Sequence, residues 1–178
     1  MNLNSRLVIS ITSVFVLSLV SLFTSCAGYR LGNIPRADMK GVQTIYVPSV
    51  RNNTLEPGLP TLTTNAILRR FDNDGTYKSV RLRKADATLD VILTKFERKP
   101  IRREVGDTSF IREYRITLTA QATLTNLKTG TIIFKNRTVK GSTDYFFQSN
   151  MQEVERQSLP LAAEKLADSL VSMVTEGW

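Results

Sequence analysis

Few residues of this chain could take part in catalysis or in metal binding. Among its 178 residues there is one cysteine, Cys26, and no histidine. Zinc and most transition-metal sites depend on thiolate or imidazole ligands, so the sequence argues against a metal centre. A Ser-His-Asp or Cys-His nucleophile lacks its base. Asp86 and Asp90 lie at expected strand positions without a suitably spaced acid–base partner. We therefore expect a protein that is not an enzyme and that holds no cofactor.

Cys26 follows a segment with the features of an export signal. Residues 1–6 are polar with one positive charge, residues 7–23 are uncharged and largely apolar, and two small residues precede the cysteine. This order is typical of a secretory signal peptide. The run Leu22-Phe23-Thr24-Ser25-Cys26 resembles the lipobox of bacterial lipoproteins, although Phe23 stands where leucine is usual. In that motif the cysteine sulfur receives a diacylglyceryl group and becomes the new N-terminus.

The lipobox resemblance implies an acyl-anchored protein. More than one acyl chain, palmitate among them, would be needed for stable anchoring. Ala27 stands where aspartate would signal inner-membrane retention, so the resemblance implies delivery to the periplasmic face of the outer membrane. Two alternatives are an ordinary signal peptide and an uncleaved membrane anchor in which the cysteine is incidental. We predict a signal peptide over residues 1–25, a lipidated N-terminus and linker over 26–41, and one domain over 42–178.

The net charge is +8, and the cations form two clusters. The first mixes cations with acidic residues and contains Lys95, Arg98, Lys99, Arg102, Arg103, Arg112 and Arg115. The second contains Lys128, Lys135, Arg137 and Lys140, in a stretch without acidic residues from Asn126 to Thr143. We expect Lys135 and Arg137 to share one strand face, with Lys140 close by at the end of the strand. Guanidinium groups suit phosphate oxygens, and lysine acts as a point charge. The alternative for both clusters is a solvated surface. Nucleic acid is not expected, because no recognition motif is present.

Hydrophobic periodicity predicts an α+β domain. Residues 43–47 and 77–82 are expected to be short strands, and residues 61–71 a helix that ends at Gly75. A strand starts near Ala87, with a bulge near Lys95, and residues 99–107 are expected to form a charged loop. The last element is a helix capped by Ser149 or Ser158, in which Pro160 occupies the first turn or causes a kink. We expect two helices packed on one face of a mostly antiparallel, about four-stranded sheet.

Residues 110–124 carry the clearest strand pattern. Apolar residues such as Ile116 and Leu118 alternate with polar ones such as Thr117 and Thr119, which is typical of an antiparallel sheet with one wet face. Asn126 to Gly130 is expected to be a hairpin loop, with residues 131–139 as the partner strand. The threonine-rich face is either ordinary exposed β surface or a contact with the polar wall of a barrel.

The chain resembles the lipopolysaccharide-assembly lipoprotein family, LptE, over most of residues 26–178. Four stretches carry the resemblance: Cys26-Ala27-Gly28-Tyr29-Arg30-Leu31-Gly32; Ile45-Tyr46-Val47-Pro48-Ser49-Val50-Arg51-Asn52-Asn53-Thr54; Leu62-Thr63-Thr64-Asn65-Ala66 leading to Phe71-Asp72-Asn73-Asp74-Gly75; and Ala85-Asp86-Ala87-Thr88-Leu89. Their order and spacing are similar to those of the family, as is the C-terminal helix. Val50-Arg51 departs from the aromatic residue that the family often has before its asparagine.

The resemblance implies an outer-membrane protein that plugs the lumen of the β-barrel translocon LptD, assists its assembly and binds lipopolysaccharide. Lipid A phosphates then become the expected ligands of the basic clusters. The candidate residues are Lys128, Lys135, Arg137, Lys140, Arg112 and Arg115. The alternative function is an accessory lipoprotein of another periplasmic transport or envelope-assembly system, which would share the anchor and the fold class without binding lipopolysaccharide.

Overall fold

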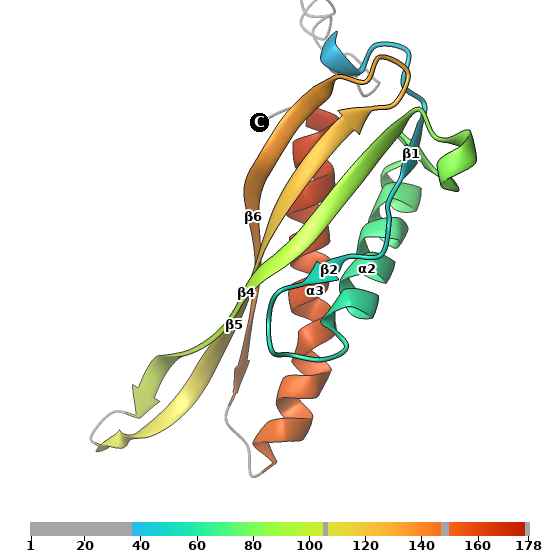
Figure 1. Ribbon diagram of the computed structural model, residues 1–178. Helices are drawn as coiled ribbons and strands as arrows, with labels where there is room; N and C mark the ends of the chain where they lie inside the picture. Colours follow the sequence, from blue (N-terminus) through green and yellow to red (C-terminus); the bar gives the residue numbers. More distant parts are fainter. Residues whose placement is uncertain (1–36, 105–106, 147–149, 177–178) are drawn as a thin grey trace, which may run out of the picture. The chain divides into compact units, whose positions relative to one another are not determined.

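The computed structural model describes residues 37–104, 107–146 and 150–176, with the side chains of all of these except Ala37 and residues 103–112. Figure 1 shows the elements and their arrangement. In chain order they are η2 (Ala37–Met39), β1 (Thr44–Tyr46), β2 (Arg51–Asn52), α2 (Leu59–Asp74), β3 (Lys78–Ser79), η3 (Leu82–Lys84), β4 (Ala87–Glu104), β5 (Asp107–Asn126), β6 (Ile132–Phe146) and α3 (Met151–Glu176). The prediction of an α+β fold with two main helices is confirmed.

Helix α2 is held between two glycines in the left-handed conformation. Gly58 occupies the N-cap with φ +81°, and a proline follows in the first turn, where its missing N–H costs no hydrogen bond. Gly75, with φ +75°, donates its backbone N–H to the Phe71 carbonyl at 3.0 Å. A positive φ at the helix end is adopted most readily by glycine. The predicted end of the helix is therefore confirmed.

The sheet is mixed and has six strands, so the prediction of about four mostly antiparallel strands is wrong in both respects. The strand order is β3-β1-β4-β5-β6, and β2 also pairs with β4. β1, β2 and β3 pair in parallel, whereas β4, β5 and β6 are antiparallel. The three parallel strands have only two or three residues each. Such short segments cannot display an alternating pattern, so their pairing is invisible in the sequence.

β4 and β5 form one long antiparallel ribbon. The register shifts between Leu93 and Lys95, which confirms the predicted bulge. Pairing then continues through Pro100, opposite Tyr114, as far as Glu104. The predicted loop over residues 99–107 is therefore wrong for the residues that the structure describes. Past Leu93, no further strand of the described chain pairs with the other side of β4, and proline is tolerated on such an open edge.

The hairpin between β5 and β6 is confirmed at Asn126 to Gly130. The Asn126 side-chain oxygen accepts the backbone N–H groups of Lys128 (2.9 Å) and Thr129 (3.2 Å), and Gly130 has φ +71°. An asparagine that bonds the backbone two residues on is a common start of a turn. β6 continues to Phe146, beyond the predicted end at residue 139.

Helix α3 contains Pro160 in its interior rather than in its first turn. Its N-terminus is held by Asn150, whose side-chain oxygen accepts the Glu153 N–H at 3.4 Å. Ser158, one of the two predicted caps, lies inside the helix and bonds the Val154 carbonyl at 2.7 Å. Ser149, the other, lies outside the described residues. An asparagine performs the capping function expected of a serine.

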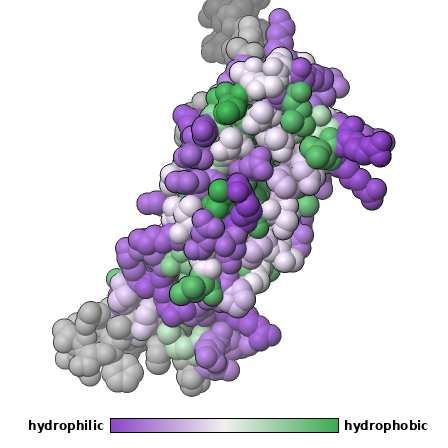
Figure 2. Space-filling view, in the orientation of Figure 1, coloured by the Kyte–Doolittle hydropathy of each residue, from purple (hydrophilic) through white to green (hydrophobic). Residues whose placement is uncertain are grey.

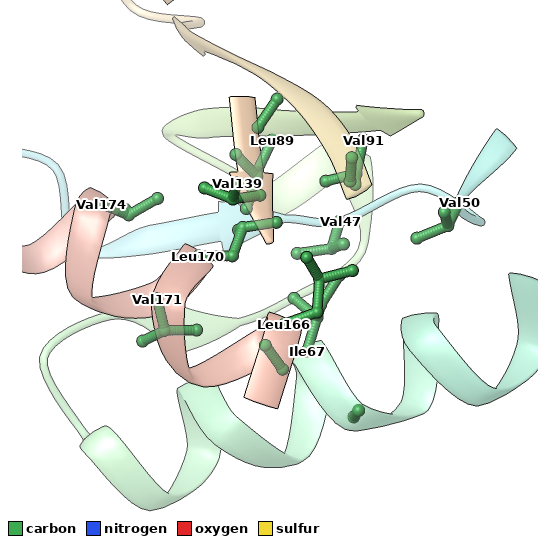
Figure 3. Close-up of a cluster of buried hydrophobic side chains, with 14 of the residues drawn as sticks. Val47, Val50, Ile67, Leu89, Val91, Val139, Leu166, Leu170, Val171 and Val174 are labelled. Carbon is green, nitrogen blue, oxygen red and sulfur yellow. The ribbon is translucent and has the colours of Figure 1, made fainter. Parts of the chain in front are cut away.

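Both helices cover the same face of the sheet, as predicted (Figure 1). Figure 3 shows how strand residues such as Leu89 and Val139 meet helix residues such as Ile67 and Leu170. Every buried hydrophobic residue of the core lies between Met39 and Val174. The buried hydrophobic residues of the described chain therefore form one core within residues 39–174.

Helix α3 approaches the sheet closely at Gly141 of β6. A Cβ atom added there would lie 2.5 Å from the Ala162 carbonyl oxygen and would also collide with the Leu166 backbone nitrogen. On the same strand, the Lys140 carbonyl accepts the Ser169 hydroxyl at 3.2 Å. Glycine thus allows α3 to lie directly on the outermost strand of the sheet.

Candidate binding surface

Asp86 joins three segments that are distant in the sequence. Its carboxylate accepts the backbone N–H groups of Gln43 (2.9 Å) and Thr44 (3.1 Å), at the start of β1. The same carboxylate lies 2.8 Å from the Lys128 ammonium in the β5–β6 hairpin. The Asp86 carbonyl accepts the Leu127 N–H at 2.8 Å. We refer to Asp86 with these partners as the Asp86 junction.

The charge at the Asp86 junction is satisfied within the fold. The Lys128 ammonium, followed by the Gln43 N–H, holds the pKa of Asp86 well below its ordinary value. Lys128 also donates to the Gly41 carbonyl at 2.9 Å. Lys128 was predicted to bind an external anion, and the structure instead places it on an internal carboxylate and carbonyl.

Three other cations of the second cluster lie on β6, and we call them the basic strip: Lys135, Arg137 and Lys140. All three are exposed, and none forms an ion pair with any residue that the structure describes. Asn136, with φ +51°, interrupts the regular pairing between them and β5. As a result, Arg137 falls opposite Ala122 and Lys140 falls opposite Thr119.

The interruption places the basic strip on both faces of the sheet edge. Lys140 lies on the open face, opposite Thr119. Lys135 comes directly after Phe134, whose ring faces the helices, so Lys135 lies on the open face as well. The Arg137 guanidinium lies 5.9 Å from the centre of the Phe134 ring, on the helix-covered face. The sequence pattern had placed Lys135 and Arg137 on one face, which is wrong because the residue at positive φ shifts the alternation.

A groove of about 690 Å³ runs between the edge of the sheet and α3. Its β6 side is lined by Arg137, Thr138 and Val139, and its α3 side includes Ser172 and Met173. β6 is the outermost strand, so the groove opens at the edge of the sheet. The lining also includes Asp168 and Ser169, so the groove is mostly polar. Arg137 thus borders the groove, and Lys135 and Lys140 lie on the neighbouring open face.

The first basic cluster is largely paired within the fold. Arg115 contacts Asp144 through two nitrogens, at 2.6 and 2.7 Å, and lowers the pKa of that carboxyl group. The other ion pairs join Lys95 and Lys99 to Glu97, Arg98 to Glu155, and Arg102 to Glu113. The side chain of Arg112 lies outside the description. Of the six candidate residues, the structure therefore leaves Lys135, Arg137 and Lys140 as unpaired cations within its described part.

The threonine-rich face of β5 is not covered by either helix. Thr117, Gln121 and Thr123 are half-buried, and Thr119 is nearly buried. Thr117 shares a hydrogen bond with Ser142 at 3.0 Å, and the Thr123 hydroxyl accepts the Asn136 N–H at 3.2 Å. The face is therefore a flat polar surface whose hydroxyls are partly engaged with the neighbouring strand.

Sequence reasoning missed the part played by Asp86. An aspartate directly before a strand of alternating residues was the available signal, but its partners at Gln43 and Lys128 are distant in sequence. Cys26 and its leader lie outside the described residues. In the described part of the chain, no helix has the length and apolarity that crossing a membrane requires.

Comparison with known proteins gives the fold and the family. A similar structure is a hypothetical protein, CT253, of Chlamydia trachomatis, with TM-score 0.55 and 10% identity over 75% of this chain and 96% of that one. Another is an uncharacterized lipoprotein B of Nitrosomonas europaea, with TM-score 0.53 and 10% identity over 84% of this chain and 92% of that one. A third is a minor lipoprotein of Acinetobacter baumannii, with TM-score 0.51 and 11% identity over 76% and 94% of the two chains.

At these identities the similar structures establish the fold alone, and no curated protein matches the chain. The family model described as LptE, lipopolysaccharide-assembly, matches residues 42–174. The match spans all six strands and both α2 and α3 except the last residues of α3. The chain therefore belongs to the lipopolysaccharide-assembly family LptE.

Proposed function

We propose that this protein is an outer-membrane lipoprotein, held by acyl groups on Cys26, that occupies the lumen of an LptD-type β-barrel and binds lipopolysaccharide during its assembly. The observation that carries the proposal is the family match over residues 42–174. The fold supports it, because the sheet has one face closed by helices and one flat polar face available to a polar barrel wall.

The basic strip is the proposed contact for lipopolysaccharide phosphates. Lys135, Arg137 and Lys140 are exposed and free of ion pairs within the described residues. Phosphate groups bind arginine through paired hydrogen bonds and lysine through its charge. The groove beside Arg137 adds two apolar side chains, Val139 and Met173, among polar ones that include Asp168, so a hydrocarbon part of the ligand could lie next to its charged part. Lys128 and Arg115 are left out of this proposal because each already holds a carboxylate.

Barrel binding is tested by purifying the acylated protein from membranes in mild detergent. We expect a large outer-membrane β-barrel to co-purify with it, and depletion of the protein to cause an envelope defect. Recovery of the protein alone, together with normal growth on depletion, would contradict the proposal. It would favour the alternative of an accessory lipoprotein of another envelope system.

Lipopolysaccharide binding is tested by reversing the charge of the basic strip with Lys135→Glu, Arg137→Glu and Lys140→Glu. We expect weaker binding than in the parent protein, with a smaller difference at high salt because salt screens exposed charges. The matched control is Arg69→Glu, Lys99→Glu and Arg156→Glu, an equal charge change on exposed residues of α2, β4 and α3. Equal losses in the two triple variants would show that only net charge matters.

A further inference from the structure

One end of the described fold brings together three segments from different parts of the sequence. These are η2 with the residues after it, η3, and the β5–β6 hairpin (Figure 1). Two contacts fix their arrangement: Lys128 donates to the Gly41 carbonyl at 2.9 Å, and Leu127 donates to the Asp86 carbonyl at 2.8 Å. We call this region the anchor-proximal end, because η2 is the first described element after Cys26.

Large aliphatic side chains are exposed at the anchor-proximal end. Leu82 of η3 is 54% exposed, Leu127 in the hairpin is 40% exposed, and Ile132 at the start of β6 is 51% exposed. Scattered exposed apolar residues are ordinary on a protein surface. Here, however, three lie on segments that the Asp86 junction holds together, so their relative arrangement is fixed before any partner binds.

Cations surround these aliphatic residues. Lys78, Arg81, Arg83 and Lys84 are all exposed, and none forms an ion pair within the part of the chain that the structure describes. No acidic residue occurs from Gly75 to Ala85. In Figure 2 the same end displays hydrophobic residues next to strongly hydrophilic ones. Exposed leucines beside unpaired lysine and arginine are the combination that binds at the interface of an anionic bilayer.

The length of chain before η2 limits how far this end can be from the acyl anchor. Only residues 27–36 separate Cys26 from Ala37. Even a fully extended chain covers at most about 3.6 Å per residue, so Ala37 lies within roughly 40 Å of an acylated Cys26. A tether of this length gives the anchor-proximal end a high effective concentration at the lipid surface.

From these observations we infer that the anchor-proximal end is a second, peripheral membrane contact that lies on an anionic phospholipid surface. Arg81, Arg83 and Lys84 bind the headgroup phosphates, and Leu82 with Leu127 enters the boundary between headgroups and acyl chains. The inference rests on the proposed acyl anchor for its geometry, but the surface itself binds lipid without that anchor. The contact orients the domain relative to the bilayer, which a single point of attachment cannot do.

The test uses residues 26–178 with Cys26→Ser, which cannot be acylated and lacks the apolar leader that would bind lipid by itself. This chain retains the core described above. We measure its flotation with vesicles of phosphatidylglycerol and phosphatidylcholine in equal amounts, and with vesicles of phosphatidylcholine alone. We expect binding to the anionic vesicles that falls as salt is added. Absence of binding to the anionic vesicles at low salt would overturn the inference.

Two variants locate the contact. Arg81→Gln, Arg83→Gln and Lys84→Gln together should lower the partition coefficient about 100-fold, since each cation near an anionic surface contributes about 1 kcal/mol. Leu82→Gln should lower it roughly tenfold. These side chains are exposed, so the unfolding midpoint should remain that of the parent. A triple variant that binds as tightly as the parent would overturn the inference.

The matched control is the Arg69→Gln, Lys99→Gln and Arg156→Gln variant, which carries an equal charge change on exposed residues outside both proposed surfaces and should float like the parent. Equal losses in the two triple variants would assign binding to net charge and overturn the inference. A third outcome is that the parent does not bind vesicles and that the Arg81, Arg83 and Lys84 variant no longer co-purifies with the barrel. The anchor-proximal end would then be a contact with the barrel instead of the bilayer. Acylation is checked separately, by measuring the mass of the peptide that contains Cys26 in protein purified from membranes. A missing acyl anchor can therefore be told apart from a missing lipid contact.

Discussion

Lys128 and Lys140 belong to the same acid-free stretch of sequence, yet they occupy very different positions. Lys128 lies 2.8 Å from the Asp86 carboxylate and 2.9 Å from the Gly41 carbonyl. Lys140 is exposed and forms no ion pair with the described residues. At the Asp86 junction, charge stabilises the fold, whereas in the basic strip it is left for solvent or a ligand. Long-range contacts, and not local composition, decide which cations of a cluster are available for binding.

The two regions also differ in how their backbone is held. The Asp86 junction is maintained by polar contacts among loops and strand ends. The basic strip lies on a strand against which α3 is pressed at Gly141. We therefore expect the strip to depend on packing and the junction to depend on charge, and four predictions test this difference.

The largest effect is expected for Gly141→Ala. The new methyl group would collide with the α3 backbone at Leu166 and Ala162, neither of which is a flexible side chain that can move aside. Overpacking of this kind lowers the free energy of unfolding by about 3 kcal/mol. Urea denaturation measures the change, and Ser142→Ala, at the neighbouring exposed position, is the control. A loss below about 1 kcal/mol would show that α3 does not fix the strand.

The second effect concerns the Asp86 junction. Asp86→Ala removes a carboxylate that accepts two backbone N–H groups and one ammonium, and should reduce the free energy of unfolding by about 2 kcal/mol. Lys128→Gln, at a largely exposed position, should cost about 0.5 kcal/mol, and Lys140→Gln should have no measurable effect. Equal costs for the two lysine variants would remove the distinction between the junction and the strip.

The α+β class, the two helices on one face and the β5–β6 hairpin were predictable because each follows from a local pattern. Residues 116–124 alternate clearly, and Gly75 and Gly130 mark a helix end and a turn where positive φ is needed. The short strands predicted at residues 43–47 and 77–82 are confirmed as β1 and β3, but β2 and the parallel pairing of all three were missed because they depend on neighbours distant in sequence. The sequence prediction ended β4 too early, before Pro100. Proline is tolerated there because no strand of the described chain pairs with the other side of β4 at this point, and that depends on the tertiary structure.

The candidate site was predictable only as a set of cations. Sequence identified all of them, but it could not distinguish Lys128 from Lys140 without knowing where Asp86 lies. It also placed Lys135 and Arg137 on one face, because the positive φ of Asn136 cannot be deduced from an alternating pattern. The exposed Leu82, by contrast, sits in a three-residue helix between polar neighbours, where no periodicity distinguishes a surface residue from a core residue.

The third prediction is a pH dependence specific to the Asp86 junction. The folded protein holds the pKa of Asp86 well below its ordinary value of 3.8, so the carboxylate stabilises the fold fully above that value. The contribution is lost as the pH falls below 3.8 toward the lower folded-state pKa. The drop in unfolding free energy between about pH 6 and about pH 3 should therefore be smaller in Asp86→Asn than in the parent protein. An unchanged drop would show that Asp86 is not the responsible carboxylate.

The smallest effect is expected at Arg115, which combines features of both regions because it is paired but exposed. Its two nitrogens contact Asp144 at 2.6 and 2.7 Å, and the Arg115 side chain is 49% exposed. Solvent screening at such a position leaves even a well-formed ion pair little stability. Arg115→Gln should lower the free energy of unfolding slightly at low salt and almost not at all at about 1 M salt, where exposed charges are screened. Asp86→Ala should keep most of its cost at the same salt concentration, because it loses two hydrogen bonds to backbone N–H groups held within the fold. If the loss of stability in Arg115→Gln did not depend on salt, solvent exposure would not explain the difference between the Arg115 pair and the Asp86 junction.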